Sequence, residues 1–145
     1  MTEDSYPFRI KAIDIRYEFT SISAEKSVPK AVVLSQITTD IFNMALLDVL
    51  EDESLSDDLV VTNNQDLRTV MATVMRILDD FLNRFPDKTV FFQGSDDRRT
   101  RLYRIVISRE LHLIQKQFKV FGLIDEQAEL FSANRPYEGF YINKL

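Results

Sequence analysis

The most regular pattern in the chain is a helical one between residues 67 and 85. Apolar residues recur there at spacings of three and four, which is the period of one face of an α-helix. They are Leu67, Val70, Met71, Val74, Ile77, Leu78, Phe81, Leu82 and Phe85. Asn63 or Asn64 stands where an N-cap is needed, and Pro86 ends the pattern. The spacing predicts an amphipathic helix that packs one face on a sheet.

Alternating apolar and polar positions predict strands on both sides of this helix. The strands expected before it cover residues 13–19, 31–38 and 41–50, and they form an antiparallel meander. Those expected after it cover residues 89–93, 119–124, 128–131 and 137–144, with a turn at Asp125 and Glu126. Two polar segments, residues 23–30 and the acidic residues 51–58, are expected as a turn and a loop.

A second helical stretch follows Gly94 and Ser95. Its apolar residues fall into two sets about 100° apart on a helical projection, so either one long helix or two short ones fits. We expect a break at Ser108, which is a suitable N-cap for a second helix. Taken together, the patterns predict one α+β domain over residues 1–145. It should have a mostly antiparallel sheet of about six strands, with two or three helices packed on it.

Composition narrows the function without assigning it. The chain has 145 residues, a formal net charge of -5 and no cysteine, which excludes disulfides, thiolate metal sites and a cysteine nucleophile. No signal-peptide pattern and no run of 18 apolar residues is present, so we expect a cytoplasmic protein without a membrane segment. The acidic balance argues against general nucleic-acid binding.

One local feature opposes that acidic balance. Residues 94–104 read GSDDRRTRLYR, and the four arginines stand near the expected start of a helix, where backbone N–H groups are unpaired and the dipole is positive. Such a strand–turn–helix junction suits phosphate or carboxylate, so we expect an anion site there. Its residues would be Ser95, Arg98, Arg99, Arg101 and Arg104, joined by Asn64 at the start of the first helix.

The same arginines have internal counter-charges available. Asp96 and Asp97 could cap the helix and offset its dipole. A second source is the acidic stretch between residues 40 and 58, which has no basic residue. Its carboxylates are Asp40, Asp48, Glu51, Asp52, Glu53, Asp57 and Asp58.

Catalysis and metal binding have weaker signals. A metal-independent ribonuclease would use arginines and a tyrosine to position phosphate and stabilise the transition state, and its residues would be Arg101, Tyr103 and Arg104 with Glu18 or Glu138.

The single histidine, His112, stands between two leucines, which indicates a partly buried helical position. In the acidic loop, Asp52, Ser54, Ser56 and Asp58 alternate, but the glycine and terminal glutamate of a calcium-binding hand are missing. Glycine-rich phosphate loops and zinc-ligand spacings are also missing from the sequence, so no cofactor is expected.

Several short motifs resemble those of a family of small bacterial proteins of unknown function. They are YEF at residues 17–19, the asparagine pair 63–64, GS at 94–95, RTRLYR at 99–104, FKVFGL at 118–123 and YEGF at 137–140. The resemblance covers nearly the whole chain and implies a single α+β domain from a bacterial cytoplasm. It implies no activity, so no catalytic residue is carried over.

These observations favour a non-enzymatic binding or regulatory domain with an arginine-lined site for phosphate, a nucleotide or RNA. One alternative is a ribonuclease-like or nucleotide-handling enzyme using the same arginines. Another is a self-associating interaction module, in which the basic stripe of one copy meets the acidic segment of another. The partner would be a phosphate-bearing ligand or a protein.

Overall fold

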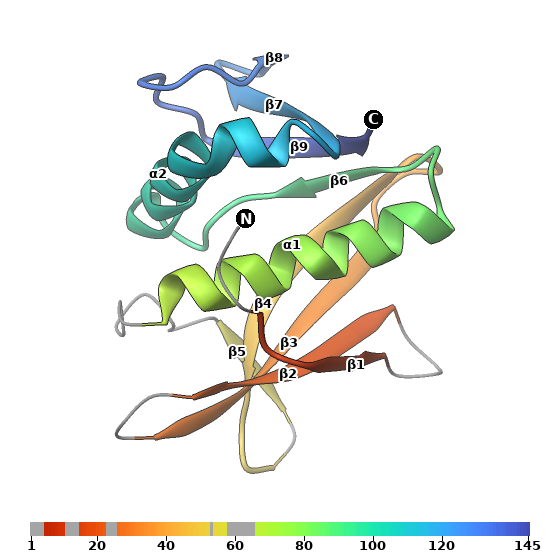
Figure 1. Ribbon diagram of the computed structural model, residues 1–145, viewed down its shortest axis with the longest axis vertical. Coiled ribbons are helices and arrows are strands. Elements are labelled where there is room, and N and C mark those ends of the chain that lie inside the picture. Colours follow the sequence, from red (N-terminus) through yellow and green to blue (C-terminus); the bar gives the residue numbers. More distant parts are fainter. Residues whose placement is uncertain (1–4, 11–14, 23–25, 53, 58–65) are drawn as a thin grey trace.

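The computed structural model describes residues 5–10, 15–22, 26–52, 54–57 and 66–145, which form nine strands of one sheet and two helices (Figure 1). The strands are β1 (Phe8–Ile10), β2 (Arg16–Ile22), β3 (Ser27–Gln36), β4 (Ile41–Val49), β5 (Leu55–Asp57), β6 (Thr89–Phe92), β7 (Phe118–Ile124), β8 (Gln127–Leu130) and β9 (Gly139–Lys144). The helices are α1 (Leu67–Arg84) and α2 (Asp97–Ile114). The mostly antiparallel α+β class is confirmed, with more strands than the pattern predicted.

The sheet is ordered β1-β2-β3-β4-β6-β9-β7-β8, and β5 pairs with β4 beside this path. The pairing of β4 with β6 is parallel, and the other pairings are antiparallel. Because β6 and β7 both run antiparallel to β9, they are parallel to each other, and α2 connects them. Helix α1 lies in the connection from β4 to β6. The predicted meander is confirmed for the strands up to β4, whereas the C-terminal half uses helical crossovers.

Helix α1 matches its prediction closely. The residues of its apolar stripe from Val70 to Leu82 are buried, and the helix ends at Arg84, before Pro86. The N-cap position is Asp66, whose carboxylate makes no capping bond; its Oδ2 accepts hydrogen bonds from Tyr6 and Ser21. Asn63 and Asn64, the predicted caps, lie outside the described residues.

Helix α2 is continuous, so the predicted break at Ser108 is wrong. The two apolar sets merge into one broad face because α2 packs against two neighbours. Ile107 belongs to the core formed with the sheet, and buried Glu110 accepts a 2.5 Å hydrogen bond from Arg68 of α1. A face that contacts both the sheet and a second helix must be wider than one apolar stripe.

Both polar segments contribute strand residues, which corrects their assignment as a turn and a loop. Ser27–Lys30 begins β3, and Lys30 is buried because it pairs with Asp48 of β4 at 2.5 Å. Leu55–Asp57 forms β5, which folds back on β4. The turn between them is stabilised by Asp52, whose carboxylate accepts from the backbone N–H and the hydroxyl of Ser54.

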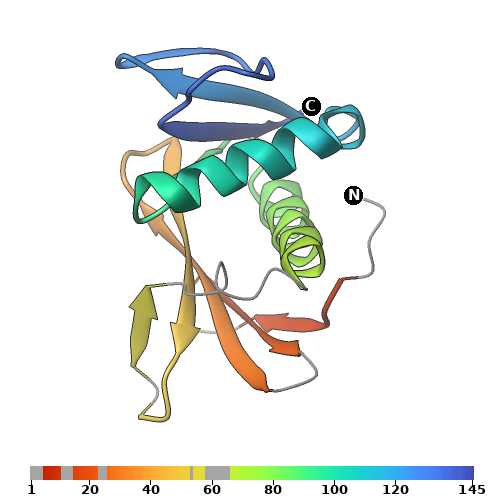
Figure 2. The same cartoon turned by 90° about the vertical axis from the view of Figure 1, so that its left-hand side faces the viewer.

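Both helices lie on one face of the sheet. The rings of Phe42 on β4 and Phe81 on α1 are 5.1 Å apart, and those of Phe92 on β6 and Tyr103 on α2 are 5.5 Å apart. Figure 2 shows the two helices inside the bend of the sheet. Among the described elements, no helix packs on the opposite face, which is called the outer face below.

Candidate functional site

The junction between β6 and α2 is tightly packed around Gly94. The Gly94 N–H donates to the Thr100 hydroxyl at 3.0 Å, and this hydroxyl donates to the Asp96 carbonyl at 3.1 Å. A Cβ on residue 94 would lie 2.3 Å from the Thr100 nitrogen, so only glycine fits. The first turn of α2 therefore occupies the space next to Gly94.

Asp96 is the N-cap of α2, and it neutralises one of the four arginines. Its carboxylate accepts from the Arg99 N–H at 2.8 Å and pairs with the Arg99 guanidinium at 2.6 Å. A capping carboxylate stabilises a helix start by satisfying an unpaired N–H and by offsetting the dipole. The predicted internal counter-charge from Asp96 is confirmed for Arg99.

None of the other three arginines pairs with this cap. Arg98 and Arg101 are exposed, Arg104 is half-buried on the flank of the helix, and Ser95 is exposed in the preceding turn. Within the described part of the chain, no salt bridge or hydrogen bond is formed by these three guanidinium groups. Asn64 lies outside the described residues, so its place relative to this turn is not defined.

The exposed face of α2 extends the cluster well beyond the predicted residues. At 100° per residue, Arg98, Arg101, Ile105, Arg109 and His112 fall within an arc of about 80° that runs about 21 Å along the helix. Lys116 follows in the exposed turn after the helix. The basic ridge is defined here as Arg98, Arg101, Arg104, Arg109 and Lys116.

The expectation that His112 is partly buried is wrong, because this residue is exposed on the same arc. Arg109 and Lys116 were not predicted because they lie outside the arginine-dense motif of residues 94–104. Their spacing from Arg98 and Arg101, near multiples of 3.6, is the signal that could have identified them.

The ridge is the positive pole of an acidic molecule. Without its five cations, the chain has 13 Lys and Arg against 23 Asp and Glu, a formal balance of -10. Near the middle of the arc stands Ile105, an apolar side chain that is 40% exposed. Cations gathered on one exposed face create a local potential that attracts anionic partners, even when the net charge is negative.

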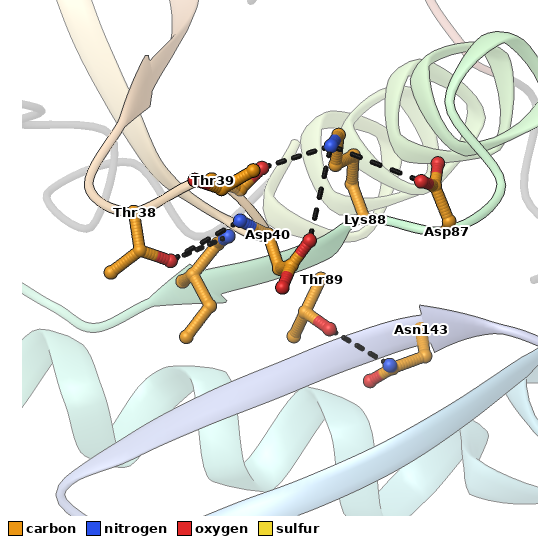
Figure 3. Close-up of polar contacts among 8 residues, drawn as sticks. Thr38, Thr39, Asp40, Asp87, Lys88, Thr89 and Asn143 are labelled. Carbon is orange, nitrogen blue, oxygen red and sulfur yellow. Dashed lines mark hydrogen bonds and ion pairs between the residues drawn. The ribbon is translucent and has the colours of Figure 1, made fainter.

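The acidic stretch that was considered as an internal counter-charge has other contacts. Asp48 pairs with Lys30 inside the molecule, and Asp40 lies 4.0 Å from Lys88 (Figure 3). Lys88 also donates to the Thr39 carbonyl at 2.9 Å, which fastens the β3–β4 turn to the segment after α1. Glu53 and Asp58 lie outside the described residues.

The pKa of Asp52 is lowered because its carboxylate accepts hydrogen bonds from the side chain and backbone of Ser54. This carboxylate therefore acts within its own turn. Among the described carboxylates of the stretch, none forms an ion pair with the basic ridge.

The residues proposed for a ribonuclease are divided between two parts of the sheet. Glu18 lies on β2, where it pairs with Arg16 at 2.9 Å, three strands from β6 in the sheet order. Glu138 precedes β9 at the end of the sheet where α2 begins, because Phe92 pairs with Phe140. Tyr103 packs its ring against Phe92 in the core. Glu138 is thus the one carboxylate of this set near α2.

The described residues have two further properties that concern metal binding and membrane insertion. They contain no group of three or more Asp, Glu, His or Cys side chains arranged to hold a metal ion. Neither helix has the length and apolar character needed to cross a membrane.

Comparison with known proteins gives one match. No curated protein and no solved structure is similar to this chain. The sequence model of a family of unknown function, DUF6934, matches residues 2–145.

Proposed function

The chain belongs to this family of unknown function, and we propose that it is a non-enzymatic binding domain that holds an anionic partner on the basic ridge of α2. The observation that carries the proposal is the alignment of Arg98, Arg101 and Arg109 on one exposed arc of α2, with Arg104 on its flank and Lys116 in the following turn, in a chain that is otherwise strongly acidic. Charges that serve the fold of this protein are paired, as the buried pair of Lys30 with Asp48 illustrates.

The proposed contact surface is the side of the helix rather than its start. Asp96 already caps the first turn and pairs with Arg99, so an incoming anion would compete with a carboxylate there. Arg98, Arg101 and Arg109 have no such competitor within the described residues, and their guanidinium groups can donate paired hydrogen bonds to phosphate or carboxylate. Arg104 borders this surface on the flank of the helix.

The test is binding of a short polyanion at low salt. We expect a fluorescein-labelled single-stranded RNA of about twelve nucleotides to bind in about 50 mM salt and to lose affinity steeply as salt is raised. The double variant R101Q/R109Q should weaken binding roughly tenfold or more, because two charged hydrogen-bond donors are lost. It should also reduce the salt slope by about 1.4, which corresponds to two lost phosphate contacts.

The matched control is K119Q/K144Q, which removes two exposed cations from β7 and β9. This variant should keep most of the affinity. Equal weakening by the two double variants would show that only net charge matters, and absence of RNA binding by the unmodified chain at low salt would reject the proposal.

A further inference from the structure

The outer face of the sheet has a composition that water-exposed sheet faces do not have. When helices cover one face of an antiparallel sheet, the face that remains in water ordinarily carries polar residues. In this protein, 15 outward positions lie on β4, β6, β7, β8 and β9, which form the outer face apart from β1, β2, β3 and β5. Ten of them are apolar: Ile41, Ala45, Leu47, Val49, Phe91, Phe121, Leu123, Ala128, Leu130 and Tyr141.

Charge is nearly missing from the outward side of these five strands, whereas β2 carries the outward ion pair of Arg16 with Glu18. The five remaining outward positions are Asn43, Thr89, Lys119, Gly139 and Asn143, so one of 15 is charged in a chain with 28% charged residues. Depletion of charge together with enrichment of aromatic residues is the compositional mark of a protein–protein interface core.

One row of outward residues crosses five strands, and four of its five members are apolar. The register aligns Asn43, Phe91, Tyr141, Phe121 and Leu130 side by side. The rings of Phe91 and Tyr141 are 4.9 Å apart, and Phe91 also covers Gly139, where a Cβ would meet the ring at 2.7 Å. At about 4.8 Å between strands, the row is about 19 Å long. It ends at Leu130 on the edge strand β8, a leucine that is 68% exposed.

We propose that the outer face is the contact surface between two copies of this chain. A symmetric contact brings the same patch together from both copies, so the patch must complement itself. An apolar face with a single lysine satisfies this condition, because it confronts its copy with almost no like charge. A charged partner would find a single charge on the outward side of these strands, that of Lys119.

The size of the face fits a dimer of modest affinity. Each outward residue occupies about 4.8 by 6.7 Å of the sheet, so 15 positions give a flat footprint of about 480 Å². Eight of the ten apolar side chains are half-buried, so the area available to a partner lies below the roughly 600–800 Å² per partner of ordinary interfaces. We therefore expect dissociation in the micromolar range. The basic ridge lies on the helix side of the sheet, so such a dimer would leave both ridges open.

The test is sedimentation velocity of the full chain up to about 500 µM, a range that covers micromolar dissociation constants. We expect a monomer–dimer equilibrium that does not weaken when salt is raised from about 50 to 500 mM, because salt screens charges but does not disrupt apolar contacts. L130D, at the exposed end of the row, should raise the dissociation constant at least tenfold. Y141K, at the centre of the row, should abolish dimerisation.

The matched control is I22D, which places the same charge on an isoleucine that is 58% exposed at the end of β2, away from the row. Unfolding in urea verifies that each variant is folded, and L130D keeps the test decisive if Y141K is unfolded.

A monomer at every concentration and both salts would overturn the proposal. So would a dimer that dissociates in high salt and is lost in R101Q/R109Q but retained in L130D. That result would show that the basic ridge of one copy binds an acidic region of another.

Discussion

The exposed face of α2 and the outer face of the sheet both meet solvent, yet their compositions are opposite. The arc of α2 has three arginines and a histidine around one isoleucine, whereas the outer face over β4, β6, β7, β8 and β9 has ten apolar residues and one lysine among 15 positions. The inward sides of the same elements are alike, because Ile107 of α2 and Phe92 of β6 belong to one apolar core. Packing in the core therefore explains the composition of the inward sides. It does not explain the composition of the exposed face of α2 or of the outer face of the sheet.

This contrast shows where further binding should be sought. An exposed helix face without a partner can carry any mixture of polar and charged residues. A face that instead carries several unpaired cations therefore indicates an anionic partner. An exposed sheet face is expected to be polar, so an apolar one is informative for the opposite reason. The two faces predict partners of different chemistry and opposite responses to salt.

The inner face of the sheet is the reference for the exposed face of α2 and for the outer face. A substitution on this inner face is expected to have the largest effect on stability. In K30M, a lysine that is 2% exposed becomes apolar and Asp48 is left buried without its cation. We expect the free energy of unfolding in urea to fall by about 3–5 kcal/mol, the usual result of breaking a buried pair.

The matched control is K30M/D48L, which removes both charges and should recover most of that loss. If the double variant is as unstable as K30M, the loss comes from packing rather than from an unpaired charge. The buried pair of Lys30 with Asp48 would then not differ in its role from the unpaired charges of the basic ridge.

On the outer face, G139A should destabilise by about 1–3 kcal/mol, because the new Cβ would meet the Phe91 ring and displace it. The measurement is urea unfolding, together with the dimer dissociation constant, which should rise as Phe91 leaves the row. In an F91A background the same substitution should cost much less. Equal costs in both backgrounds would show that the ring and the glycine are not coupled.

At the start of α2, D96A should cost about 0.5–2 kcal/mol, the value of an N-cap. It should also tighten binding of the RNA probe, because Arg99 loses the carboxylate that pairs with it. D97A is the matched control, since it removes a neighbouring carboxylate that is not the cap and should cost less. R101Q should change stability by no more than about 0.5 kcal/mol. A larger loss in R101Q would mean that the ridge serves the fold.

Local features of the fold followed well from the sequence. The stripe that ends at Pro86 predicted α1 because neighbours three and four apart share a helix face. The turn at Asp125 and Glu126 was predicted, and both residues adopt the positive φ angles of a tight hairpin turn. The break at Ser108 was wrong because the width of the buried face of α2 depends on α1, which contributes Arg68.

Only part of the candidate site could be predicted from the sequence. The arginines and the capping role of Asp96 were visible within eleven consecutive residues, since a cap and its helix are local. Which arginines remain without a partner depends on where distant carboxylates lie, and Asp48 and Asp40 turned out to pair with Lys30 and Lys88. Long-range pairing cannot be derived from spacing along the chain.

The sequence by itself determined the helices, the alternation along most strands and the concentration of positive charge at the start of α2, because these depend on neighbours a few residues apart. Only the tertiary structure decided that β6, β9 and β7 lie side by side and that both helices cover the same face. Alternation separates the two sides of a strand but does not say which side is covered. Phe91, Tyr141 and Phe121 therefore look like ordinary strand residues in the sequence and form an open apolar row in the fold.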